Sequence, residues 1–153
     1  MGRTNYQSDL SADENLLMSV VRAAEIFKRI VSTIFRKYNL SFPQYNVLRV
    51  VDSSRDGQSR ITDVSRIMLV PGANMTGLAK RLEKNGFIKR KSDPSDERVT
   101  ILEITEKGKK TLAKIKKERD EHTDAMLKGF PEKEKQSFLE MVKKFIMNSR
   151  HFE

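Results

Sequence analysis

A strand–turn–strand pattern in the middle of the chain restricts the fold more than any other feature of the sequence. Strand-forming residues occupy 87–91 and 99–104, and the stretch SDPSDERVTILEIT (92–105) contains the turn between them. This stretch holds several acids and a single arginine, Arg98, although the chain has a net charge of +9. Proline among aspartates is typical of a turn, and alternating apolar residues are typical of a half-buried strand. We therefore expect a β-hairpin that presents Arg98 near its tip.

A short helix, a turn and a second helix precede this hairpin. Thr62 is suited to cap a helix over 63–69, and the tight turn VPG (70–72) follows it. A second helix is predicted over 73–85, because the Asn-Gly pair at its end tolerates a left-handed backbone. The residues of the first helix that we expect to face the core are Val64, Ile67 and Met68. Two helices joined in this way are typical of a helix-turn-helix, and the hairpin behind them makes the pattern that of a winged helix.

The second helix of this pair has one apolar and one basic face. Its apolar face, expected to be core, carries Met75, Leu78, Ala79 and Leu82. Its opposite face carries Asn74, Thr76, Lys80, Arg81 and Lys84. A basic helix in this position is suited to the major groove of DNA. The same side chains would also serve as an ordinary solvated face, so this pattern alone leaves both interpretations open.

Longer amphipathic helices flank the central part of the chain. A capping box, Ser11-x-x-Glu14, begins a helix over 11–38 with apolar residues at spacings of three and four. Further helices are predicted over 41–51, from 106 to about 128, and from 131 onward. The last helix is expected to bury Phe138, Leu139, Val142, Phe145 and Ile146.

The positive charge is concentrated in one segment. Residues 60–119 contain 16 lysines and arginines against 8 aspartates and glutamates, a net charge of +8, which leaves +1 for all other residues. A protein that is basic only for solubility would spread its charge more evenly. This asymmetry is typical of a surface that binds nucleic-acid phosphates.

Composition excludes several classes of protein. The chain has no cysteine, which excludes disulfides, thiolate catalysis and cysteine-based zinc sites, and its two histidines offer little for any other metal site. The first 15 residues contain no apolar run, so neither a secretion signal nor a membrane span is expected. These observations favour a cytoplasmic protein without metal or cofactor.

The order of these elements, together with four motifs, resembles the MarR family of bacterial transcription regulators, which are dimeric winged-helix repressors and activators. The motifs are LSFPQYNVL (40–48), Thr76-x5-LEKNGFI-x-Arg90, Asp93-Pro94-x-Asp96-x-Arg98 and Ile104-Thr105-x-x-Gly108. The resemblance covers about residues 12–148. It implies a mainly α fold with a small β-hairpin wing. A winged helix-turn-helix DNA-binding lobe (41–105) and a helical dimerisation arm (11–38 and 106–150) would form one domain, 1–153.

The resemblance also implies which residues bind double-stranded DNA. The recognition helix would enter the major groove, where asparagine pairs with adenine and arginine with guanine. Arg98 would enter the adjacent minor groove, while Asp93 and Asp96 would fix the shape of the wing. Gly77 departs from the family pattern, because many members carry a polar or basic side chain at this position. The expected DNA-binding residues are Asn74, Thr76, Lys80, Arg81, Lys84, Lys89, Arg90, Lys91 and Arg98.

Dimerisation and regulation are expected from the same resemblance. A two-fold homodimer predicts a palindromic operator whose half-sites lie about one helical turn, ~10 bp, apart. In the family, an effector binds between the dimer arm and the lobe. We expect a repressor released by a small aromatic or acyl-type molecule, and constitutive DNA binding without an effector is the alternative. The candidate pocket residues are Arg22, Phe27, Tyr38 and Tyr45, although as core residues they would need no ligand.

Three other classes of function are weighed against a DNA-binding regulator. An enzyme would need a nucleophile–base pair or a metal cluster, and the sequence offers neither. A winged-helix protein–protein adaptor would need neither the basic segment nor an arginine in the wing. An RNA-binding winged helix would differ in its lack of preference for duplex DNA. We therefore expect a transcription regulator and not an enzyme.

Overall fold

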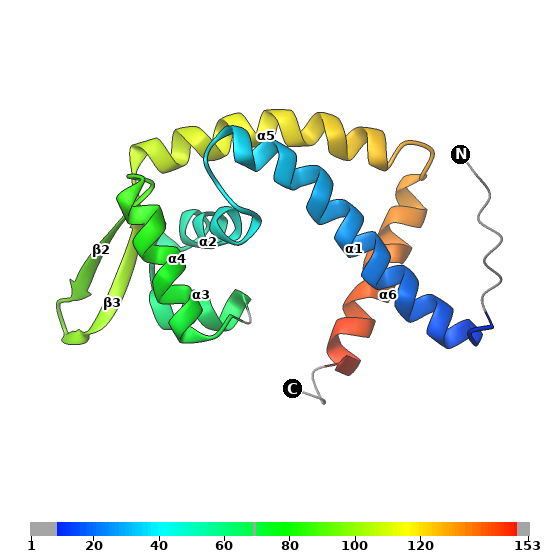
Figure 1. Ribbon diagram of the computed structural model, residues 1–153, viewed down its shortest axis with the longest axis horizontal. Helices are drawn as coiled ribbons and strands as arrows, with labels where there is room; N and C mark the ends of the chain where they lie inside the picture. Colours follow the sequence, from blue (N-terminus) through cyan, green and yellow to red (C-terminus); the bar gives the residue numbers. More distant parts are fainter. Residues whose placement is uncertain (1–8, 69, 150–153) are drawn as a thin grey trace. The chain divides into compact units, whose positions relative to one another are not determined.

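The computed structural model describes residues 9–68 and 70–149, and it is mainly α-helical with one small sheet (Figure 1). Its helices are α1 (Ala12–Lys37), α2 (Phe42–Asp52), α3 (Ile61–Met68), α4 (Gly72–Lys84), α5 (Glu106–Met126) and α6 (Glu132–Ser149). Its strands are β1 (Gln58–Arg60), β2 (Ile88–Asp93) and β3 (Asp96–Ile104), and a 3-10 turn, η1 (Arg55–Gly57), precedes β1. The predicted fold class, helical with a hairpin wing, is confirmed.

The helix starts follow from local sequence. In both α1 and α2 a serine caps the helix and a side chain three residues later returns a hydrogen bond, with Ser11 and Glu14 in α1 and Ser41 and Gln44 in α2. Such capping boxes satisfy amides that have no partner inside the helix. After α1, Asn39 adopts the left-handed conformation at φ 58° and turns the chain toward α2.

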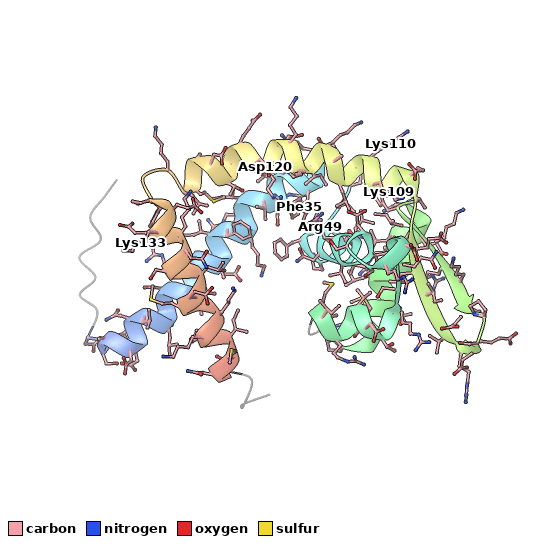
Figure 2. All side chains as sticks on the ribbon, turned by 180° about the vertical axis from the view of Figure 1, so that it is seen from behind. Phe35, Arg49, Lys109, Lys110, Asp120 and Lys133 are labelled. Carbon is pink, nitrogen blue, oxygen red and sulfur yellow. The ribbon has the colours of Figure 1, made fainter. Side chains whose placement is uncertain are left out.

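The chain forms two compact units, Met1–Lys117 and Glu118–Glu153, and the boundary between them falls within α5. The hydrophobic core belongs to the first unit, and it extends beyond the predicted lobe, 41–105. The last turns of α1 contribute Phe35 (Figure 2). Its ring stacks on that of Tyr45 of α2, with the centroids 3.9 Å apart. The first turns of α5 contribute Leu112 and Ile115. The lobe is therefore closed by helices that also extend away from it.

The sheet has three antiparallel strands in the order β1-β3-β2. The sequence predicts two of them, and the structure extends both toward the turn, so that only Pro94 and Ser95 separate β2 from β3. The third strand, β1, consists of Gln58, Ser59 and Arg60, whose polar side chains give no strand signal. It forms because residues 101–103 of β3, which pair with β2 along one edge, offer their other edge to β1.

Three details of the helix-turn-helix differ from expectation. α3 begins at Ile61, so Thr62 lies inside the helix and does not cap it, and the predicted end at Leu69 lies outside the described residues. Val64 is fully buried and Met68 packs against the core, but Ile67 is 63% exposed. Successive helical residues are rotated by about 100°, so a two-turn helix that points Val64 and Met68 inward leaves Ile67 at the margin of that face. The prediction that Ile67 faces the core is wrong.

The last helix also differs from expectation. None of the described residues of α6 is buried, and the residues predicted to be covered are exposed or only partly covered. The apolar side chains of α1 before Ile30 are likewise exposed. Within residues 9–68 and 70–149, these two amphipathic faces are therefore left exposed. No helix in the described part of the chain is both long and apolar enough to cross a membrane.

Candidate nucleic-acid interface

Helix α4 has the two faces that the sequence predicts. Met75, Leu78, Ala79 and Leu82 are buried, which anchors the helix on the lobe. Asn74, Thr76, Lys80, Arg81 and Lys84 are all exposed on the remaining surface. The Thr76 hydroxyl donates to the carbonyl of Gly72 at 3.1 Å, so it is oriented by its own helix. α4 thus presents one amide, one oriented hydroxyl and three cations to the solvent.

The turn between α3 and α4 is held by hydrogen bonds between residues at its ends. The amide of Val70 donates to the carbonyl of Ser65 at 3.1 Å, and the Ser65 hydroxyl donates back to the Val70 carbonyl. A hollow of about 300 Å³ lies between the two helices and is lined by Ile61, Thr62, Ser65, Gly72, Met75 and Thr76. These bonds fix the end of α3 against the start of α4.

An ion pair joins the end of α4 to the first strand of the wing. One oxygen of Glu83 accepts from the backbone amide of Arg90 at 2.9 Å, and the other accepts from its guanidinium at 2.7 Å. Hydrogen bonds from the Arg90 side chain and amide hold the pKa of the Glu83 carboxyl below its usual value. The guanidinium of Arg90, expected at the DNA, is therefore engaged within the lobe.

Asp93 connects the turn of the wing to the body of the lobe. Its carboxylate accepts from the amide and hydroxyl of Ser95 at 2.9 and 2.6 Å, and from the guanidinium of Arg60 at 3.0 Å. Hydrogen bonds from Ser95, and then the charge and hydrogen bond of Arg60, lower the pKa of Asp93 against the effect of desolvation. Arg60 was not among the residues singled out from the sequence, because only the pairing of β1 with β3 brings it near the wing.

Asp96 holds the arginine of the wing. One of its carboxylate oxygens accepts from both the backbone amide and the Nε of Arg98, each at 3.1 Å. The Arg98 side chain is nevertheless 91% exposed. Because Asp96 engages only Nε, the terminal nitrogens of the guanidinium point into solvent without a partner among the described residues.

The remaining cations of β2 differ in their surroundings. Lys91 forms an ion pair with Glu103 of β3 at 2.8 Å, and Gln58 of β1 donates to the same carboxylate. The ammonium of Lys91 is the main reason that the pKa of Glu103 is lowered. Lys89 is exposed on the same strand. Lys91 therefore contributes to the sheet, whereas Lys89 projects from it.

The expected effector residues do not share one site within the described structure of the first unit. Tyr45 is buried in its stack with Phe35, and Tyr38 is partly buried against the core. Arg22 and Phe27 are exposed on α1, and five residues of helix place them about 140° apart. Two hollows of the lobe, of about 300 and 320 Å³, are lined by other residues.

Comparison with known proteins identifies the family. The family model of the transcriptional regulator SarA/Rot matches residues 29–115, more than half of the chain. The chain belongs to the SarA/Rot family of transcriptional regulators. The matched region includes the helix-turn-helix, the wing and all the candidate site residues except Arg22 and Phe27. Family and fold are thus those of winged-helix transcriptional regulators and not of enzymes.

Individual relatives of this SarA/Rot-family regulator are also transcriptional regulators. TtmR of Methylorubrum extorquens is 30% identical over 75% of the chain, which spans only 58% of the length of TtmR. YfiV of Bacillus subtilis, an uncharacterized HTH-type transcriptional regulator, is 31% identical, with 69% of this chain and 70% of YfiV covered. PecS of Dickeya dadantii is 25% identical, with 95% of this chain and 91% of PecS covered.

Solved structures share the fold of this regulator. A MarR protein from Peptoclostridium difficile superposes with a TM-score of 0.84 at 21% identity, covering 97% of this chain and 96% of its own. A MarR family regulator from Streptomyces coelicolor, solved in complex with DNA, has a TM-score of 0.80 at 20% identity, with 95% and 92% covered. The expectation of a MarR-type winged helix is confirmed.

Proposed function

We propose that this chain is a sequence-specific repressor that binds double-stranded DNA in the cytoplasm as a homodimer on a palindromic operator. The observation that carries this proposal is the exposed guanidinium of Arg98, which Asp96 fixes close to the turn of the hairpin. A protein-binding wing has no need for a cation held in this way. The family and the DNA complex of a relative with the same fold support the same conclusion.

The residues of the lobe are assigned to contacts by their chemistry. Asn74 on α4 can pair with adenine in the major groove, and Thr76 suits phosphates or base edges. Lys80, Lys84 and Lys89 are exposed cations suited to phosphates. Arg90 and Lys91, which are paired with Glu83 and Glu103, would act mainly by fixing the wing against α4 and β3. Arg98 would enter the minor groove, where narrow A·T stretches concentrate negative potential.

The homodimer follows from uncovered apolar faces. Monomeric proteins rarely leave contiguous apolar helix faces in water, and a second copy of the chain covers such faces by two-fold symmetry. The exposed apolar residues of the two helices are Leu16, Leu17, Met18, Val20, Val21, Ile26, Phe27, Phe138, Leu139, Met141, Phe145, Ile146 and Met147. A two-fold dimer would place two recognition helices on successive major grooves, which requires a palindromic site.

The repressor would be released by a small aromatic or acyl-type effector. Arg22 and Phe27 are exposed on different sides of α1, where they are accessible to a ligand. A guanidinium suits a carboxylate, and an aromatic ring suits an aromatic or acyl group. Tyr38 and Tyr45 would act through the packing that joins α1 to α2. Binding of such a ligand would alter the spacing of the two lobes of the dimer.

The wing is tested by fluorescence anisotropy with a labelled duplex from upstream of the chain's own gene. We expect Arg98→Ala to weaken binding by about tenfold or more while the dimer stays intact, since each good arginine contact contributes ~1–3 kcal/mol. Arg55→Ala is the matched control: Arg55 is 97% exposed and lies beside Asp56, but it precedes β1 at the opposite end of β3. Equal affinity of the Arg98→Ala variant and the unmodified chain would exclude a role of Arg98 in DNA binding.

Salt dependence tests the phosphate contacts in the same assay. The logarithm of the association constant should fall linearly with the logarithm of salt concentration, with a slope that reports several released counterions. Lys84→Gln and Lys89→Gln should each lower this slope by about one. An affinity that does not change with salt would contradict binding through phosphates.

A further inference from the structure

Arg81 on α4 differs from the other arginines of the lobe. The arginines at 49, 55, 60, 66, 90 and 98 each form an ion pair with a carboxylate. Within 41–68 and 70–105, Arg81 alone has no such partner, although it is exposed on the recognition helix. Its guanidinium is therefore the one in this region of which every nitrogen, Nε included, is outside an ion pair with the described residues.

Gly77 lies one turn before Arg81 on the same face. A Cβ built on Gly77 would have one described neighbour within 4 Å outside the helix backbone, the Nη2 of Arg81 at 4.0 Å. Packing within the lobe therefore does not require glycine here. Gly108 is different, because a Cβ there would lie 2.5 Å from the carbonyl oxygen of Phe87. Gly108 is needed by the fold, whereas the one described group near a Cβ at Gly77 is the guanidinium of Arg81, at an ordinary van der Waals distance.

We propose that Gly77 and Arg81 form one specificity-determining unit, in which Gly77 leaves the helix face open so that the Arg81 guanidinium lies along it and reads a guanine. A side chain at position 77 would occupy the path of the arginine and compete with it for the base edge. This inference rests on the proposed binding of duplex DNA and assigns its main guanine contact.

The chemistry of guanidinium explains why guanine is the base. Guanine presents two acceptors, O6 and N7, to the major groove, and a planar guanidinium can donate to both at once. Lysine carries the same charge as a single point and cannot reproduce the two parallel hydrogen bonds. A phosphate contact would need only the charge, so Arg81→Lys separates the two roles.

The test begins with selection of preferred duplexes from a random-sequence pool by the unmodified chain. Failure to enrich any sequence would refute the proposed function and leave nothing for this unit to explain. If a sequence is enriched, Arg81→Ala and Arg81→Lys should each lower affinity for it by about tenfold or more, and selection with either variant should lose one guanine per half-site. Recovery of the same sequence with Arg81→Ala, with affinity lowered equally for all duplexes, would overturn the proposal in favour of a phosphate contact.

A double-mutant cycle tests the role of Gly77. Gly77→Leu should reproduce the loss of guanine preference, because its side chain occupies the position of the guanidinium, and Gly77→Ala should cause a smaller loss. Leucine and alanine are both strong helix formers, so α4 is retained in both variants. In the Arg81→Ala background, Gly77→Leu should change guanine preference by less than about twofold, because the residue through which it acts is absent. If the losses of guanine preference caused by Gly77→Leu and Arg81→Ala were instead independent and multiplied in the double variant, Gly77 would act by making room for the DNA itself. That result would overturn the proposal that the two residues act together.

Discussion

The same kind of sequence pattern has opposite outcomes in the lobe and in two helical segments outside it, the first half of α1 and α6. Apolar residues at helical spacing become buried in the lobe, where every member of the hydrophobic core lies between Val31 and Ile115. The same spacing in the first half of α1 and in α6 leaves large apolar side chains exposed. Periodicity therefore predicts that a face will be covered, but it does not say which molecule covers it.

The two regions also differ in charge. The lobe and the start of α5 hold nearly all the excess positive charge, and most arginines of the lobe are fixed by carboxylates. On α6 the ion pairs are between neighbouring residues of one helix, such as Lys135 with Glu132 and Lys143 with Glu140. The lobe thus presents cations in fixed positions, whereas α6 and the first half of α1 expose apolar side chains that the proposed dimer would cover.

The largest effect should come from a charge placed in the uncovered face of α6. Phe138 is 61% exposed in the single chain, and Phe138→Glu should abolish the dimer, because a carboxylate buried in an apolar interface has no partner. Loss of the dimer should lower operator affinity about 100-fold or more, since the second half-site is no longer tethered. Sedimentation velocity measures the oligomeric state.

The matched control for this change lies in the lobe. Ile67 has almost the same exposure as Phe138, yet Ile67→Glu should leave the oligomeric state unchanged. If both variants dissociate, or neither does, the proposed difference between the two surfaces is wrong: α6 would not be the surface that a second chain covers.

A cavity in the core should have the next largest effect. Leu82 is fully buried, and Leu82→Ala should lower the free energy of unfolding by ~2–5 kcal/mol at every protein concentration. Leu139→Ala on α6 should instead have a cost that depends on concentration, because Leu139 is expected to be covered only in the dimer. Urea unfolding at two protein concentrations distinguishes the two variants. If the loss of unfolding free energy caused by Leu139→Ala did not depend on protein concentration, this would argue against a dimer through α6.

Removal of the tie between β1 and the wing should have a smaller effect. Arg60 is half exposed, so Arg60→Ala should lower global stability by less than ~1 kcal/mol. It should still speed hydrogen exchange at residues 93–98 and weaken DNA binding several-fold, because Asp93 then holds only Ser95. Arg49→Ala, which removes a pair of similar exposure on α2, is the control and should leave exchange in the wing unchanged.

The smallest effect is expected from pH. The pKa of Asp93 is lowered in the folded lobe by Ser95 and then Arg60, so its ionised form stabilises the fold above the unfolded pKa, about 3.9. This contribution is lost as pH falls through the lower, folded pKa. Urea unfolding between pH 3 and 6 should therefore show a shallower loss of stability for Asp93→Asn than for the unmodified chain. Parallel profiles would mean that the charge of Asp93 contributes nothing to the wing.

Parts of the site could be predicted because they depend on neighbouring residues. The buried face of α4 and the capping boxes at Ser11 and Ser41 rest on contacts within four residues, which sequence spacing encodes. The pairing of Asp96 with Arg98 is also local. The roles of Arg60 and Glu83 were not predicted, because their partners lie 33 and 7 positions away and residue type alone does not indicate such a pairing.

The sequence by itself determined the order of the helices and of the two hairpin strands, the basic face of α4 and the arginine at the wing. Only the tertiary structure decided that Gln58–Arg60 forms a strand, that Ile67 faces outward, and that Arg90 is held by Glu83 while Arg81 is free. The physical reason is how far apart along the chain the interacting residues lie. Helix periodicity, capping and turns arise from interactions a few residues apart, whereas the choice of partner for a polar side chain depends on which distant segments the fold brings within hydrogen-bonding distance.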